Sequence, residues 1–82
     1  MSTTMSVPDL ADVLFACRLQ PSADPTPDEV RVAIDELLGA CAGAQGRCVA
    51  YVAQEAGDHP ETYTDRMHWA LCTVTRAYAL AA

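Results

Sequence analysis

The hydrophobic positions in the last third of the chain recur with the period of an α-helix. With 3.6 residues per turn, apolar side chains gather on one helical face and mainly polar side chains on the other. The apolar face consists of Tyr63, Met67, Ala70, Leu71, Val74, Ala77, Tyr78 and Ala81. The opposite face consists of Glu61, Asp65, His68, Cys72 and Arg76. The pattern predicts a long amphipathic helix that carries a thiol among charged side chains.

Capping signals predict two helices before it. Ser6, with Asp9 three residues later, predicts the start of a helix that stops before Pro21. Its apolar face is Leu10, Val13, Leu14 and Cys17. After a linker, the run Thr26-Pro27-Asp28-Glu29 combines a capping box with proline at the first helical position. This second helix carries Val30, Ile34, Leu37, Leu38 and Cys41 on one stripe and ends within residues 39–43.

A short third helix is expected over Gln45 to Ala56. Its inward positions are Cys48, Val49, Val52 and Ala56, with Cys48 at the edge of the apolar stripe. Gly57 is predicted to end it in the left-handed conformation, and Asp58 to cap the fourth helix. The fourth helix, about 22 residues and ~33 Å long, exceeds its partners, so we expect its tail from Ala77 onward to project.

No stretch alternates in the manner of a half-buried strand, so the prediction is an all-α fold. We expect a compact four-helix bundle with a long C-terminal helix. Much of the 51% hydrophobic content is alanine, which favours closely packed helices. One helical domain should span residues 1–82, with residues 1–5 disordered.

The charge balance excludes several classes of function. A net charge of −6 leaves no basic patch for nucleic acid or an anionic membrane. The N-terminus lacks the basic region of a signal peptide, and no apolar run approaches the ~18 residues of a membrane span. We therefore expect a cytoplasmic protein that binds neither nucleic acid nor membrane and whose cysteines are thiols or ligands.

The four cysteines differ in their predicted surroundings. Cys17 and Cys41 lie on core stripes, whereas Cys72 lies on a polar face. We expect no bound metal or cofactor. An alternative combines Cys41 and Cys48 with the i, i+4 pair His68 and Cys72 as a zinc site, although the spacing matches no zinc knuckle. A disulfide between Cys41 and Cys48 is a further alternative.

Trp69 lies between the polar face and the apolar stripe of the last helix. Because tryptophan and arginine are enriched at binding hot spots, we predict a contact strip on this helix. The strip consists of Trp69, Cys72, Arg76 and Leu80. The alternative is that the first helix, through Phe15 and Leu19, covers Trp69 within one molecule.

These observations favour a non-enzymatic protein that binds a copy of itself or a larger partner. A catalytic role is not expected, because His68 and Cys72 lack a pocket and an orienting third group. The acids around His59 are explained by helix capping. The competing hypothesis is a metal-binding or thiol-based redox sensor that uses Cys72 with His68 and with Cys41 and Cys48. A third is an acidic mimic of nucleic acid, with acids at Asp24, Asp28, Glu29, Asp35 and Glu36.

Overall fold

A computed structural model describes residues 6–17, 19–40 and 43–79. Within this part of the chain every regular element is helical, and the predicted all-α four-helix bundle is confirmed. The helices are α1 (Val7–Ala16), α2 (Pro27–Ala40), α3 (Ala44–Asp58) and α4 (Pro60–Ala79), with a short 3₁₀ helix, η1 (Pro21–Ala23). The predicted disorder of residues 1–5 lies outside the described residues.

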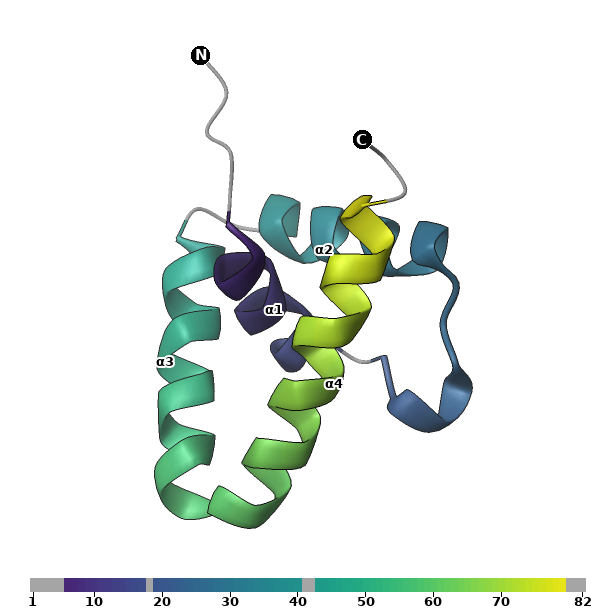
Figure 1. The fold of residues 1–82 in the computed structure, drawn as a ribbon. Coiled ribbons are helices and arrows are strands. Elements are labelled where there is room, and N and C mark those ends of the chain that lie inside the picture. Colours follow the sequence, from purple (N-terminus) through teal and green to yellow (C-terminus); the bar gives the residue numbers. More distant parts are fainter. Residues whose placement is uncertain (1–5, 18, 41–42, 80–82) are drawn as a thin grey trace.

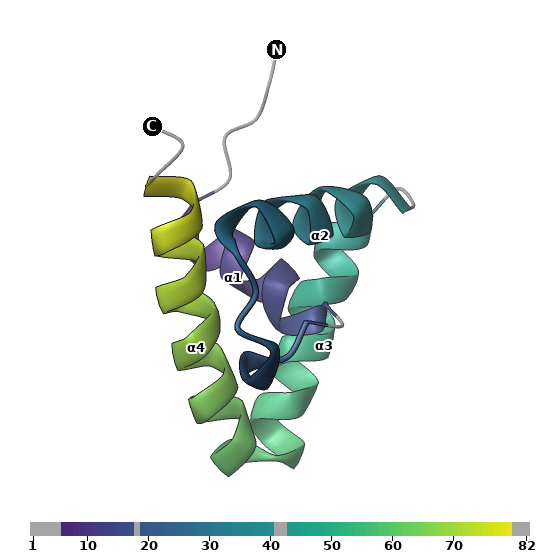
Figure 2. The same cartoon turned by 90° about the vertical axis from the view of Figure 1, so that its right-hand side faces the viewer.

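The helices form a wedge around α1. Helices α3 and α4 meet at one end and diverge from it, and α2 lies across their open end (Figure 1, Figure 2). Helix α1 fills the space between them and contacts all three. A central helix must be apolar on several sides, and Ala11, Val13, Leu14 and Phe15 are indeed all buried. Residues of α2, α3 and α4 complete this core: Val30, Ile34, Cys48, Ala70, Val74 and Ala77.

Both predicted capping boxes are present. The Thr26 backbone N–H donates to Glu29 Oε1 at 2.8 Å, and the Glu29 N–H donates to Thr26 Oγ1 at 3.2 Å. Ser6 and Asp9 make the same reciprocal pair, each bond 3.4 Å long. These bonds satisfy N–H groups that the first helical turn leaves without a partner, so α1 and α2 begin where the sequence predicts.

The corner between α3 and α4 differs from the prediction. Helix α3 continues through Gly57 to Asp58, so Gly57 does not end it and Asp58 does not cap α4. His59 forms the joint instead: its N–H donates to the Glu55 carbonyl oxygen, and its own carbonyl accepts from the Tyr63 N–H, both at 2.8 Å. Pro60 then occupies the first position of α4, where a missing N–H costs nothing.

The left-handed glycine lies at a different connection. Among the described glycines only Gly43 has positive φ, at +79°, and it immediately precedes α3. Val49, predicted to point inward from α3, is 44% exposed. Cys48, predicted to point inward at the edge of the stripe, is buried and only 4% exposed. Helix α3 is therefore rotated so that Cys48, rather than Val49, faces α1.

The faces of α4 match the prediction. Ala70, Val74 and Ala77 are buried, whereas every residue of the predicted polar face is exposed. The prediction that the tail of this helix projects from Ala77 onward is wrong at Ala77 itself. This residue is 1% exposed, and its carbonyl oxygen accepts a 2.6 Å hydrogen bond from Arg31 Nη1 of α2. In the part of the chain that the structure describes, no helix has both the length and the apolar character required to cross a membrane.

Candidate functional site

The predicted contact strip borders the proline-rich connection between α1 and α2. Trp69, Cys72 and Arg76 line a cavity of about 180 Å³ together with Pro21 and Pro25 of that connection. Trp69 is partly buried and packs against the hydrophobic core, so it is at least partly covered within one molecule. Cys72 and Arg76 are exposed. Leu80, the fourth predicted member, lies outside the described residues.

Arg66, which the sequence reasoning did not single out, connects this region to the end of α1. Its Nε donates to the Phe15 carbonyl oxygen at 2.9 Å, and its Nη2 donates to those of Cys17 and Leu19 at 3.0 Å each. The last carbonyls of a helix have no partner within the helix and carry its negative end. A guanidinium supplies both the hydrogen bonds and the positive charge that this helix end requires.

The guanidinium of Arg66 also contacts aromatic rings. Its central carbon lies 5.4 Å from the Phe15 ring centroid and 5.0 Å from the Trp69 ring, distances at which a cation is attracted to a ring face. The Phe15 ring further contacts Tyr51 and Tyr63, with centroids 6.0 and 5.8 Å apart. Helical spacing could have identified Arg66 from the sequence. Arg66 stands one turn before the buried Ala70 and therefore lies next to the apolar stripe.

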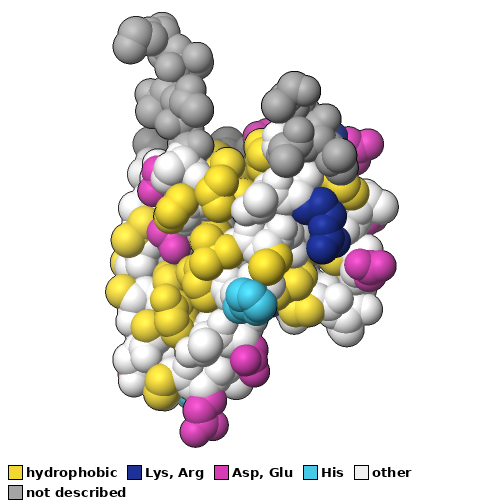
Figure 3. Space-filling view, viewed as in Figure 1, with side chains coloured by type: hydrophobic (Ala, Val, Ile, Leu, Met, Phe, Trp, Pro, Cys, Tyr) yellow, Lys and Arg dark blue, Asp and Glu magenta, His cyan; other side chains and the backbone are white. Residues whose placement is uncertain are grey.

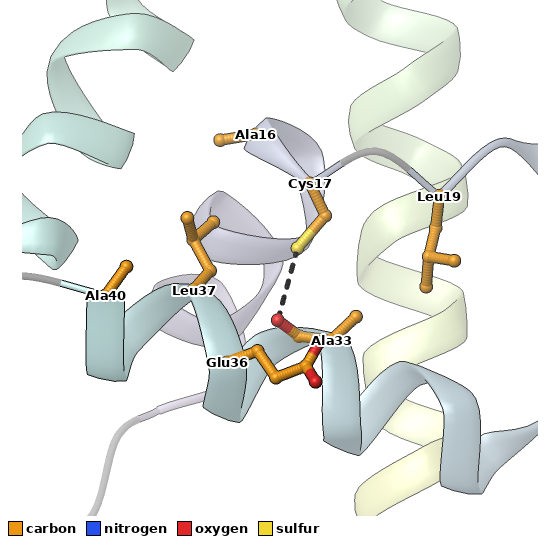
Figure 4. A pocket seen from close by; sticks show the side chains of 7 residues that line it. All are labelled: Ala16, Cys17, Leu19, Ala33, Glu36, Leu37 and Ala40. Carbon is orange, nitrogen blue, oxygen red and sulfur yellow. Dashed lines mark hydrogen bonds between the residues drawn. The ribbon is translucent and has the colours of Figure 1, made fainter.

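An apolar groove lies between the C-terminal end of α1 and α2, and we call it the α1–α2 groove (Figure 4). Its volume is about 550 Å³. It is lined by Ala16, Cys17, Leu19, Ala33, Glu36, Leu37 and Ala40. Short alanine side chains leave the space open, and Glu36 is the single charged residue in the lining.

Two cysteines are associated with this groove. Cys17, partly buried, directs its thiol to the Ala33 carbonyl oxygen, with 3.9 Å between Sγ and O (Figure 4). Burial raises the Cys17 pKa to about 11, and Cys48 adds to this effect, whereas Arg66 opposes it. Cys48 lines an adjoining cavity of about 290 Å³, which shares Ala16, Leu37 and Ala40 with the groove. Cys17 is therefore protonated at neutral pH and is a weak nucleophile.

His68 and Cys72 form an exposed pair on α4, with His68 Nε2 and Cys72 Sγ 3.7 Å apart. The structure does not join this pair to Cys48, which is buried on α3. Among the described residues, no group of three or more histidine, cysteine, aspartate or glutamate side chains is placed to hold one metal ion. Cys41, the remaining predicted ligand and disulfide partner, lies outside these residues.

The acidic cluster at the corner of α3 and α4 surrounds a shallow hollow. Asp58, His59 and Glu61 are exposed and line a space of about 220 Å³. The backbone of His59 joins the two helices, and the Thr62 hydroxyl donates to the His59 carbonyl oxygen at 3.2 Å. This corner thus has a clear structural role, as the sequence suggested, although His59 rather than Asp58 provides it.

No family model matches the chain, and neither a curated protein nor a solved structure matches it. The groove, the Trp69 region and the His68–Cys72 pair are therefore the features from which a function can be argued.

Proposed function

We propose that this protein is a non-enzymatic binding protein whose α1–α2 groove receives an amphipathic helix of a protein partner. The observation that carries the proposal is the groove itself, an open apolar space of about 550 Å³ between two helices. Grooves of this kind take up the apolar face of a partner helix, whose anchoring side chains recur every three or four residues. The alanines that line it permit close approach of that helix.

The charge of α2 supports a basic partner. Helix α2 contains four acidic residues and one arginine, and that arginine, Arg31, is already paired with Asp28. Glu36, on the groove itself, and the neighbouring Asp35 are exposed. An incoming helix with lysine or arginine beside its apolar stripe would therefore meet complementary charge, which favours both orientation and rate of association.

The adjoining cavity lengthens the apolar surface. It shares three residues with the groove and continues to Ala44 and Cys48, with Arg47 exposed at its rim. A helix lying along both cavities would contact α1, α2 and α3 together. We also propose a cytoplasmic location for this acidic protein.

The proposal can be tested with two synthetic amphipathic peptides that share one leucine pattern, one rich in lysine and the other in glutamate. We expect the lysine peptide alone to bind and to shift the amide resonances of Ala33 and Leu37 in a ¹⁵N-labelled sample. Ala40→Trp, which fills the groove, should weaken binding about tenfold, equivalent to ~1.4 kcal/mol. Ala53→Trp, at an exposed position of α3 outside the groove, should leave it unchanged.

A charge control separates groove binding from general attraction to an acidic protein. Glu36→Gln and Glu61→Gln change the net charge equally, but only Glu36 lines the groove. We expect Glu36→Gln to weaken binding by roughly threefold and Glu61→Gln to have no effect. Equal binding by all four variants would refute the proposed site.

A further inference from the structure

The exposed His68–Cys72 pair has the geometry of half a zinc site. In tetrahedral coordination, zinc lies about 2.3 Å from a cysteine sulfur and about 2.0 Å from a histidine nitrogen, which places these ligand atoms roughly 3.5 Å apart. The distance between Cys72 Sγ and His68 Nε2 is 3.7 Å. The two side chains therefore stand at the ligand spacing of a tetrahedral zinc ion without a change of rotamer.

The described residues of one chain do not complete such a site. Structural zinc sites use four protein ligands, and the described residues provide no third ligand close to this pair. Both residues are exposed on the outer face of α4, so a second chain can approach them. We propose that zinc, or another divalent ion with the same preference for sulfur and nitrogen, joins two copies of this chain through a shared site of two Cys72 and two His68 side chains.

A two-fold axis fits this arrangement. Rotation about an axis on the exposed face of α4, midway along the helix between His68 and Cys72, sets the two α4 helices antiparallel. It places His68 of one copy opposite Cys72 of the other. The same rotation places Asp65 opposite Thr75 of the second copy, one residue from its Arg76. Asp65 and Arg76 are both exposed on this face, so the axis brings opposite charges together twice.

The surroundings of the pair also suit a contact between copies. A shallow depression of about 430 Å³ next to it is lined by Leu71, Cys72, Thr75 and Arg76. Figure 3 shows that this side of the molecule presents apolar side chains between α3 and α4. A second copy would cover part of that apolar surface.

Zinc binding at this site involves no oxidation or reduction. Each Cys72 thiol releases its proton to water as the sulfur–zinc bond forms, and each His68 Nε2 donates its lone pair. Two thiolates neutralise the two positive charges of the ion, so metal binding adds no net charge between two acidic chains. The proposal does not depend on peptide binding in the α1–α2 groove, which lies on other helices.

Native mass spectrometry of the full chain with added zinc and a non-thiol reductant tests the proposal. We expect a dimer with one zinc ion, which reverts to monomer when EDTA is added. His68→Gln and Cys72→Ser should each weaken zinc binding at least about tenfold and abolish the dimer. The matched controls are His59→Gln, at the other histidine, and Cys17→Ser, in the groove. Both variants should still bind zinc and form the dimer. Circular dichroism verifies that each variant remains helical.

A second measurement reports the ligands directly. Cobalt(II) in place of zinc should give the visible absorption of a tetrahedral site with sulfur ligands, and this absorption should vanish in Cys72→Ser. The proposal is overturned if zinc binds one per monomer, if no zinc binds, or if the dimer survives in His68→Gln.

Discussion

Arg66 on α4 binds both the backbone and the ring of Phe15 on α1. Its Nε lies 2.9 Å from the Phe15 carbonyl oxygen, and its guanidinium carbon lies 5.4 Å from the centroid of the Phe15 ring. The same guanidinium reaches the Cys17 and Leu19 carbonyl oxygens. One side chain therefore closes the end of the central helix and holds it against α4.

Loss of this guanidinium should be costly. Arg66→Met keeps much of the apolar stem but leaves three carbonyl groups without their donor, so we expect the free energy of unfolding to fall by about 3 kcal/mol. Urea denaturation followed by circular dichroism measures the change. Arg76→Met, at an exposed position on the same helix, is the matched control and should change stability by less than about 0.5 kcal/mol. Equal effects of the two substitutions would contradict this role of Arg66.

The capping box of α2 gives a second prediction. Thr26→Ala removes the hydroxyl that accepts from the Glu29 N–H and should destabilise the protein by about 1 kcal/mol. Ser22→Ala, in the exposed connection before α2, should be neutral by the same urea assay. An unchanged denaturation midpoint for Thr26→Ala would show that the hydroxyl does not stabilise this helix start.

Trp69 should stabilise the folded state in addition to any external contact that it makes. Its ring lies against the Arg66 guanidinium and packs on the hydrophobic core. We therefore expect Trp69→Ala to lower the free energy of unfolding by about 2 kcal/mol, less than for a fully buried tryptophan. Val32→Ala, at a position that is 54% exposed, should have little effect in the same assay. A neutral Trp69→Ala would mean that the ring serves only external contacts.

The surroundings of the cysteines predict an order of reaction with a thiol reagent. In the folded, metal-free protein Cys72 should be labelled first, because it is exposed. Cys17 should react far more slowly, since a pKa of about 11 leaves roughly one thousandth of it as thiolate at pH 8. Cys48, which is 4% exposed, should require unfolding. Peptide mapping after brief labelling checks the order, and labelling of Cys17 before Cys72 would contradict it.

The raised pKa of Cys17 also predicts how stability depends on pH. The unfolded thiol, with a pKa near 9.0, ionises before the folded thiol at about 11, so rising pH favours the unfolded state over this interval. The stability that Cys17 contributes should be complete below pH 9 and lost by pH 11, a decline of about 1–2 kcal/mol once partial exposure is allowed for. The difference in unfolding free energy between wild type and Cys17→Ser reports this contribution, because only the wild type carries the thiol. A difference that stays constant from pH 8 to 11 would refute it.

The sequence by itself determined where most helices lie and which way α4 faces. The boxes at Ser6 and Thr26 act between residues three apart, and the stripe of Ala70, Val74 and Ala77 follows from the helical period alone. Such signals are local, so they can be read without knowledge of the neighbours. The His68–Cys72 pair is equally local, since its spacing of four residues is one helical turn.

The tertiary structure decided the rest. The burial of α1 on several sides, the rotation of α3 toward Cys48, and the bond from Arg66 to Phe15, 51 residues away in sequence, depend on how the helices cross. The α1–α2 groove likewise joins Cys17 to Ala33, and its volume depends on the packing of two helices with short side chains at their contact. Helical periodicity specifies which residues share a face, but packing against other helices decides which faces meet and where space remains between them.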